Sequence, residues 1–179
     1  MESSGKAAEA MLDQAIRQLQ DGSFENAIKG FTACLLVSPD HAAAFRGRAT
    51  ARFQLKDWTG AAADFLRAKE LNPDDPENWL GYGMSLALQL QIYPAIGVLD
   101  SLIARWPTFV RGHIQLGLLH IKLGAITKGK RALEEALKHE PNLQERRLIE
   151  TTLNEQSKLD KGRYYRPDFE DLHRKKPNS

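Results

Sequence analysis

The chain has 179 residues, of which 42% are hydrophobic, and a formal net charge of +2. This near balance of charge favours neither a nucleic-acid-binding surface nor a strongly acidic one, and the single cysteine, Cys34, excludes an internal disulfide. The N-terminal segment does not resemble a secretory signal, and no run of about 18 apolar residues occurs. We therefore expect a cytoplasmic protein that binds no nucleic acid and does not insert into a membrane.

Helical spacing of apolar residues alternates with turn signals up to about residue 139. Leu12, Ile16 and Leu19 predict a first helix that ends before Gly22, and Pro39 ends the second because proline cannot donate the helical hydrogen bond. The same pattern continues along the chain. The predicted helices span residues 7–20, 24–37, 42–55, 58–71, 77–90, 92–105, 110–123 and 126–139.

The turn at residues 90–94 differs from the others. It lacks the glycine that Gly22 and Gly124 supply in the first and fourth turns. Pro94 falls in the first turn of the helix that follows, where its missing N–H costs little. The helix is therefore predicted to begin before this proline.

The C-terminal part of the chain is more polar. Residues 143–160 keep an amphipathic spacing and predict one more helix, whereas residues 161–179 hold two prolines and six basic against three acidic residues. This second segment is a basic tail that contains aromatic residues.

Prolines and apolar residues recur with one fixed period. Pro39, Pro73, Pro107 and Pro141 are each 34 residues apart. Small residues lie 24 and 12 positions before each proline, and bulky residues lie 15 and 8 positions before it. The small residues are Ala15, Ala49, Gly83 and Gly117, then Ala27, Ala61, Ala95 and Gly129; the bulky ones are Phe24, Trp58, Ile92 and Ile126, then Phe31, Phe65, Leu99 and Leu133. Such a period is typical of helix-turn-helix units that bury one face against the next copy.

In these columns the chain resembles the tetratricopeptide repeat (TPR) family over roughly residues 8 to 143. The resemblance implies an all-α, right-handed superhelical solenoid of four repeats within a domain spanning residues 7–160. The repeats would span residues 8–41, 42–75, 76–109 and 110–143. The helix at 143–160 would then cap the last repeat and shield it from water.

The resemblance also implies a concave groove lined by the first helix of each repeat. Three columns per repeat would face it. They are Leu12, Ile16 and Leu19; Arg46, Thr50 and Phe53; Leu80, Met84 and Ala87; and Ile114, Leu118 and Ile121. Nine of these twelve residues are Leu, Ile, Met or Phe, so we expect something to cover the groove.

Three coverings stay open at this point. One is a protein partner that lays a peptide or an amphipathic helix in the groove. Another is the chain's own tail, which would dock through Tyr164, Tyr165, Phe169 and Leu172, and a third is a second copy in a homo-oligomer. The leading function is a non-catalytic scaffold or adaptor for protein–protein interaction. The alternative is a dedicated chaperone for a secreted or assembly-prone client, because the size and apolar groove resemble the small TPR chaperones of type III secretion.

One subgroup of the family clamps the C-terminal carboxylate of heat-shock chaperones with lysine, asparagine and arginine. The matching places in this chain hold neither a basic residue nor asparagine. A register shifted by one repeat places Arg46 and Arg111 in the clamp but supplies no asparagine. Arg48 and Arg52 lie one helical turn apart, and they either contact an anion together with Arg46 or hold the neighbouring unit as in ordinary TPRs.

The sequence shows no convergent set of catalytic residues, and we expect no cofactor and no metal. His113 and His120 share a helix face, but no cysteine or carboxylate with metal-ligand spacing lies beside them. Cys34 falls in a small, buried column, and Gly81 and Gly83 do not continue into a phosphate-binding loop. We interpret both histidines and the cysteine as core residues.

Overall fold

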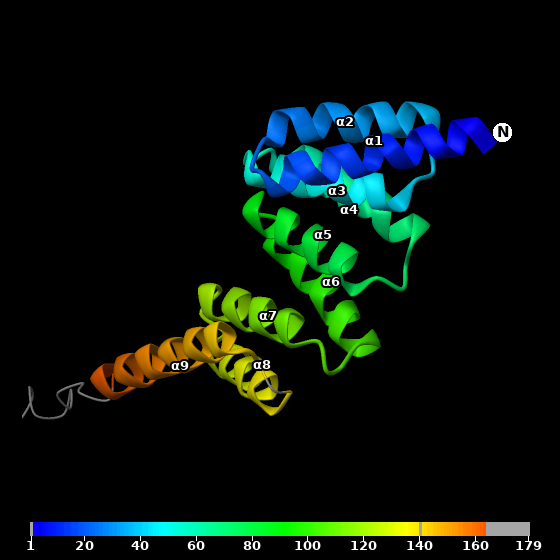
Figure 1. Cartoon of the computed structure of the whole chain (residues 1–179). Coiled ribbons are helices and arrows are strands. Elements are labelled where there is room, and N and C mark those ends of the chain that lie inside the picture. The colour runs from blue at the N-terminus through cyan, green and yellow to red at the C-terminus, as the bar shows by residue number, and fades with distance from the viewer. Residues whose placement is uncertain (1, 140, 164–179) are drawn as a thin grey trace, which may run out of the picture.

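The computed structural model describes residues 2–139 and 141–163, and this part of the chain consists of nine α-helices and no strand (Figure 1). The bounds are α1 Glu2–Gln20, α2 Phe24–Val37, α3 Ala42–Gln54, α4 Trp58–Leu71, α5 Pro76–Leu88, α6 Ile92–Arg105, α7 Val110–Lys122, α8 Ile126–Lys138 and α9 Leu143–Arg163. The fold is the all-α superhelical solenoid that the family resemblance implies.

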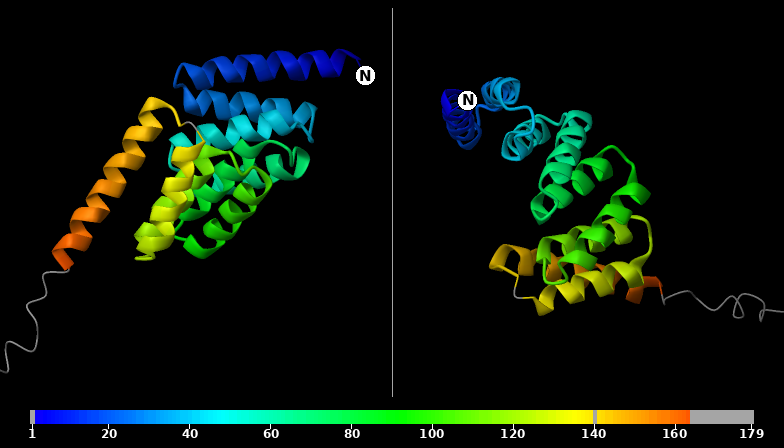
Figure 2. Two further views of the ribbon diagram at one scale, coloured as in Figure 1. Left: turned by 90° about the horizontal axis from the view of Figure 1, so that it is seen from below. Right: turned by 90° about the vertical axis from the view of Figure 1, so that its right-hand side faces the viewer.

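The helices stack in antiparallel pairs. Figure 1 shows α1–α2, α3–α4, α5–α6 and α7–α8 following one another, and Figure 2 shows the same stack from two other sides. Each pair packs against the next, because α2 contacts α3, α4 contacts α5 and α6 contacts α7. The first helices also touch along the array, α1 with α3, α3 with α5 and α5 with α7. These four first helices therefore form one layer.

The predicted helix bounds agree with the structure to within two residues, except at the two ends of the described chain. α1 begins at Glu2 rather than near Ala7, and α9 extends to Arg163. Pro76 is the first residue of α5, one residue earlier than predicted. Asp75 caps this helix by accepting a 3.0 Å hydrogen bond from the Glu77 N–H, and proline suits the first helical position because it has no N–H to leave unpaired.

The bulky column forms the core between repeats. Phe31 and Leu99 are fully buried, and Phe65 is 6% exposed. The two rings lie on glycines of the next repeat: a Cβ atom added to Gly47 would lie 2.3 Å from Phe31 Cζ, and one added to Gly81 would lie 2.5 Å from the Phe65 ring. A ring can reach the backbone of the next first helix only because that helix has no side chain there.

The cap at the C-terminal end is confirmed, although it covers less than its length suggests. Ile149 of α9 is fully buried in a cluster with Ile114 and Leu133. The helix then runs away from the array (Figures 1 and 2), and Leu148 and Leu159 remain 45% and 56% exposed. α9 thus seals the last repeat with its first half.

The turn within each repeat needs one residue with a positive φ angle. Gly22 (φ 76°), Lys56 (63°), Leu90 (63°) and Gly124 (78°) occupy this position, each 34 residues after the one before. Glycine adopts this left-handed conformation freely, whereas a residue with a Cβ is strained in it. The second and third repeats therefore hold a strained residue where the other two hold glycine.

Replacing Leu90 by glycine should stabilise the protein. The side chain is 75% exposed, so little packing is lost, and relief of the strained φ should raise the free energy of unfolding by about 0.5–1 kcal/mol. Urea denaturation followed by circular dichroism measures this change. Gln91→Gly is the control at the next residue, where φ is −82° and glycine should give no gain. Equal effects in the two variants would contradict the assignment.

Gly47→Ala should be destabilising because its methyl group would overlap the buried Phe31 ring. We expect a loss of about 1–3 kcal/mol in the free energy of unfolding. Gly97→Ala is the matched control, since a Cβ at this position of α6 meets no atom within 4 Å. Alanine favours the helix over glycine, so the control should gain about 0.5–1 kcal/mol. Changes of the same sign in both variants would show that the ring does not require the glycine.

Candidate functional site

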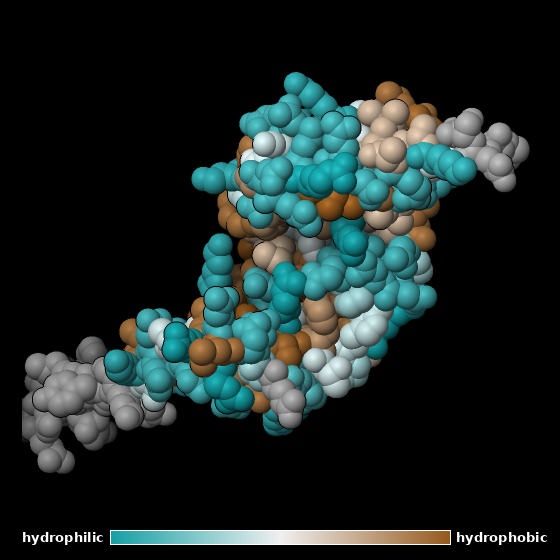
Figure 3. All heavy atoms as spheres, viewed as in Figure 1, coloured by the Kyte–Doolittle hydropathy of each residue, from teal (hydrophilic) through white to brown (hydrophobic). Residues whose placement is uncertain are grey.

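A pocket of about 380 Å³ opens between the first helices of the second, third and fourth repeats. On the face shown in Figure 3 the surface is hollowed between the upper and lower helix pairs, and hydrophobic surface appears inside the hollow behind a largely hydrophilic rim. The pocket is lined by Arg46, Thr50, Phe53, Gln54, Phe65, Glu77, Leu80, Gly81, Met84 and Arg111.

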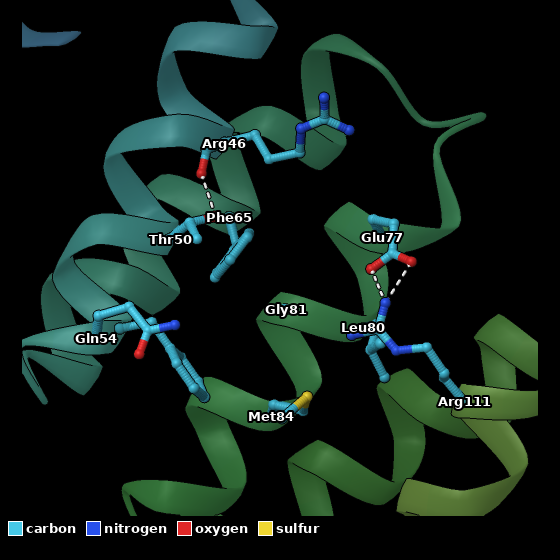
Figure 4. A pocket seen from close by; sticks show the side chains of 10 residues that line it. Arg46, Thr50, Gln54, Phe65, Glu77, Leu80, Gly81, Met84 and Arg111 are labelled. Carbon is cyan, nitrogen blue, oxygen red and sulfur yellow. Dashed lines mark hydrogen bonds and ion pairs between the residues drawn. The ribbon is translucent and has the colours of Figure 1, made fainter. Parts of the chain in front are cut away.

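The floor of the pocket is apolar. Phe53 of α3 lines it, together with Leu80 and Met84 of α5 and Phe65 of α4. Figure 4 shows the last three of these side chains. Phe53 is held by an edge-on contact with Trp58, with ring centroids 4.9 Å apart. Phe65 and Leu80 are buried, whereas Phe53 and Met84 are half-buried and remain accessible to a ligand.

The mouth of the pocket carries charges that are already paired. Arg46 Nη1 donates to Asp75 Oδ2 at 2.5 Å, and Arg111 Nη1 donates to both carboxylate oxygens of Glu77 at 2.5 and 2.7 Å. The second pair lies on one side of the pocket, opposite Thr50 and Gln54 (Figure 4). Both carboxylates lie at the N-terminal end of α5, where negative charge is favourable to the helix dipole.

The structure brings five of the twelve residues predicted for the groove into this pocket, namely Arg46, Thr50, Phe53, Leu80 and Met84. The other residues of the first predicted column, Leu12 and Ile114, are buried in the core. The remaining five residues are half-buried: Ile16, Leu19, Ala87, Leu118 and Ile121. A ligand-binding role for these columns stays a prediction.

Five pocket residues were absent from the predicted groove columns: Gln54, Phe65, Glu77, Gly81 and Arg111. The sequence does hold a signal for the charged pair, because Glu77 and Arg111 are 34 residues apart and occupy the same column in consecutive repeats. Opposite charges in one column predict an ion pair across the repeat boundary.

Arg48 and Arg52 bind an internal carboxylate. Arg48 forms two 2.8 Å hydrogen bonds with Asp64, and Arg52 forms one of 2.7 Å. The Asp64 side chain is 5% exposed, so the two arginines compensate a buried charge. The arrangement ties α3 to α4 and gives both arginines a structural role.

Other reactive side chains serve the core. Burial raises the pKa of the Cys34 thiol above its ordinary value, with a smaller contribution from the Glu9 charge. His113 is 6% exposed, its Nε2 lies 2.7 Å from the Pro107 carbonyl oxygen, and its ring stacks on His139. Among the described residues no group of three or more His, Cys, Asp or Glu side chains is arranged to hold a metal ion.

Two further predictions concern the docking of the tail and insertion into a membrane. Tyr164, Tyr165, Phe169 and Leu172, which were predicted to dock the tail, lie outside the described residues. Within residues 2–139 and 141–163, no helix combines the length and apolar character needed to cross a bilayer.

Comparison with protein families decides the identity of the repeats. Residues 12–76 match the family model described as tetratricopeptide repeat. This segment consists of tetratricopeptide repeats. Comparison of its sequence with curated proteins gives no match.

Solved structures of similar fold extend the likeness over most of the chain. The crystal structure of MamA has a TM-score of 0.70 at 20% identity, covering 74% of this chain and 77% of MamA. PilF of Pseudomonas aeruginosa has a TM-score of 0.67 at 20% identity, and the match covers 77% of this chain and 63% of the PilF chain. The first TPR domain of Spaghetti (RPAP3), bound to the HSP90 peptide SRMEEVD, has a TM-score of 0.62 at 19% identity, covering 65% and 93%. Identities this low show the shared fold alone.

Proposed function

We propose that this TPR protein is a non-catalytic scaffold or adaptor that binds a segment of a protein partner in its concave groove. The pocket between α3, α5 and α7 receives an apolar side chain of that segment. One observation carries the proposal: accessible apolar side chains line an open pocket whose charged side chains, Arg46, Glu77 and Arg111, are already in ion pairs.

The size and lining of the pocket support a peptide as the ligand. A volume of about 380 Å³ lies near the lower end of ligand pockets in general, about 300–1,000 Å³, and suits one or two side chains better than a large cofactor. Large apolar side chains buried in such pockets are the anchors of most protein interfaces. Thr50 and Gln54 offer polar groups beside the floor that can hold a peptide backbone.

The comparison structures support the same kind of ligand. The TPR domain of RPAP3 was solved with a seven-residue peptide bound, so a solenoid of this fold accommodates a short peptide. The partner of that domain is not transferred to this chain, because the identity is 19%.

The direction of α9 favours a separate partner over the chain's own tail. α9 ends at Arg163 and carries the chain away from the array (Figures 1 and 2). A tail that filled the groove of the same molecule would have to reverse this direction along the whole of α9. We therefore place a protein partner first, and the tail and a second copy are competitors that binding experiments can measure.

Met84→Glu should weaken peptide binding while the fold is kept. The side chain is half-buried at the pocket floor, and a carboxylate there would meet Phe53 and Leu80 without a partner. A displayed library of random 12-residue peptides is selected against the full chain, and the dissociation constant of the best peptide is measured by fluorescence anisotropy. We expect at least about a tenfold weakening, which is about 1.4 kcal/mol.

Leu36→Glu is the matched control, because Leu36 is 81% exposed on α2 and does not line the pocket. It should bind the peptide as the unmodified chain does. Repeating the titration with a chain that ends at Arg163 measures competition by the tail. Undiminished binding by Met84→Glu, or selection of no peptide at all, would contradict the proposed function.

A further inference from the structure

Two arginines flank the apolar pocket, and each is bound to a carboxylate of α5. Arg46 comes from the second repeat and Arg111 from the fourth, and both line the pocket. Their side chains are 44% and 50% exposed, so a ligand can approach them. Without the carboxylates, the mouth would be a strongly cationic site for an acidic peptide.

Glu77 differs from Asp75 in its relation to the pocket. Asp75 caps α5 and is 19% exposed, and it does not line the pocket, whereas Glu77 lines the pocket and is 42% exposed. Both oxygens of Glu77 engage the same Arg111 Nη1. A ligand carboxylate that approached Arg111 would share its guanidinium with Glu77 and be repelled by the charge of Glu77, so Arg111 attracts it less than an unpaired arginine would.

The equivalent positions of the neighbouring repeats show why Glu77 pairs with the fourth repeat and not with the second. The residue one period before it is Ala43, which has no charge to offer, and the residue one period after it is Arg111. The pair thus spans the boundary between the third and fourth repeats, on one side of the pocket that Leu80 and Met84 also line (Figure 4).

We propose that Glu77 determines the charge specificity of the pocket. By occupying Arg111 and presenting its own charge to the mouth, it selects a segment in which the apolar anchor is flanked by uncharged residues and rejects one with acidic flanks. This inference rests on the proposed function and adds the class of partner sequence.

The test compares the peptides that the unmodified chain and the Glu77→Gln variant select from the library of random 12-residue peptides. Glutamine keeps the size of the side chain but frees Arg111 from a charged partner. We expect apolar anchors from both proteins, with acidic residues beside the anchor depleted for the unmodified chain and enriched for the variant. The best peptide of the unmodified chain, synthesised again with glutamate on both sides of its anchor, should bind Glu77→Gln about fivefold to tenfold more tightly than it binds the unmodified chain.

Two further variants separate this effect from a change in fold. Arg111→Gln leaves the Glu77 charge uncompensated, so it should weaken binding of the acidic peptide further and leave the neutral peptide within about twofold. Glu70→Gln is the matched control, since Glu70 also pairs with an arginine, Arg67 at 3.1 Å, but does not line the pocket. It should change the affinity for neither peptide.

The outcomes distinguish the inference from the proposal beneath it. If the unmodified chain and Glu77→Gln select acidic flanks equally often, the specificity role of Glu77 is wrong while the peptide-binding function stands. The same holds if Arg111→Gln tightens the acidic peptide. If neither protein selects any peptide, the proposed function fails, and this inference fails with it.

Discussion

The contact of an aromatic ring with a glycine of the next repeat is the interaction on which the rest of the structure depends. Phe31 lies on Gly47 and Phe65 lies on Gly81, and in both cases a single methyl group would fill the space that the ring uses. The second contact also shapes the candidate site, because Phe65 and Gly81 both line the pocket. The ring that joins the second repeat to the third is thus also a wall of the pocket.

Several charged side chains of the described residues are paired with one another, both within repeats and across their boundaries. Asp64 holds Arg48 and Arg52 within the second repeat, and Glu77 holds Arg111 across a repeat boundary. The buried pair is a structural device, whereas the exposed pairs at the mouth contribute little to stability and compensate the charges of Arg46 and Arg111. In the function that we propose, a ligand is recognised chiefly through the apolar surface that it covers.

Much of the fold could be predicted from the sequence, because one period repeats the same physical requirements four times. Proline ends each repeat, small residues lie where helices approach closely, and Phe31 or Leu99 fills the space between repeats. Other features depend on contacts that no local pattern contains. The positive φ at Lys56 and Leu90 is imposed by the turn of the repeat, and neither residue type signals it.

The pocket could be predicted only in part for the same reason. The family resemblance predicted that Thr50 and Met84 face the groove, but it does not tell how far each residue is buried or that Phe65 of α4 lines the pocket. The Glu77–Arg111 pair could be predicted from the sequence, because the two opposite charges lie one period apart. Its place at the mouth follows from the stacking of α5 on α7, which is a tertiary contact.

The most direct test of the account is a titration of the full chain, labelled with carbon-13 at its methionine methyl groups, with the best library peptide. The sequence has three methionines, of which Met84 lies in the pocket and Met11 packs against the core of the first repeat. We predict that the Met84 signal shifts with the same saturation curve as the fluorescence anisotropy, while the Met11 signal stays in place. Saturable binding that leaves Met84 unshifted would show that the peptide binds elsewhere and that the pocket is not the interaction site.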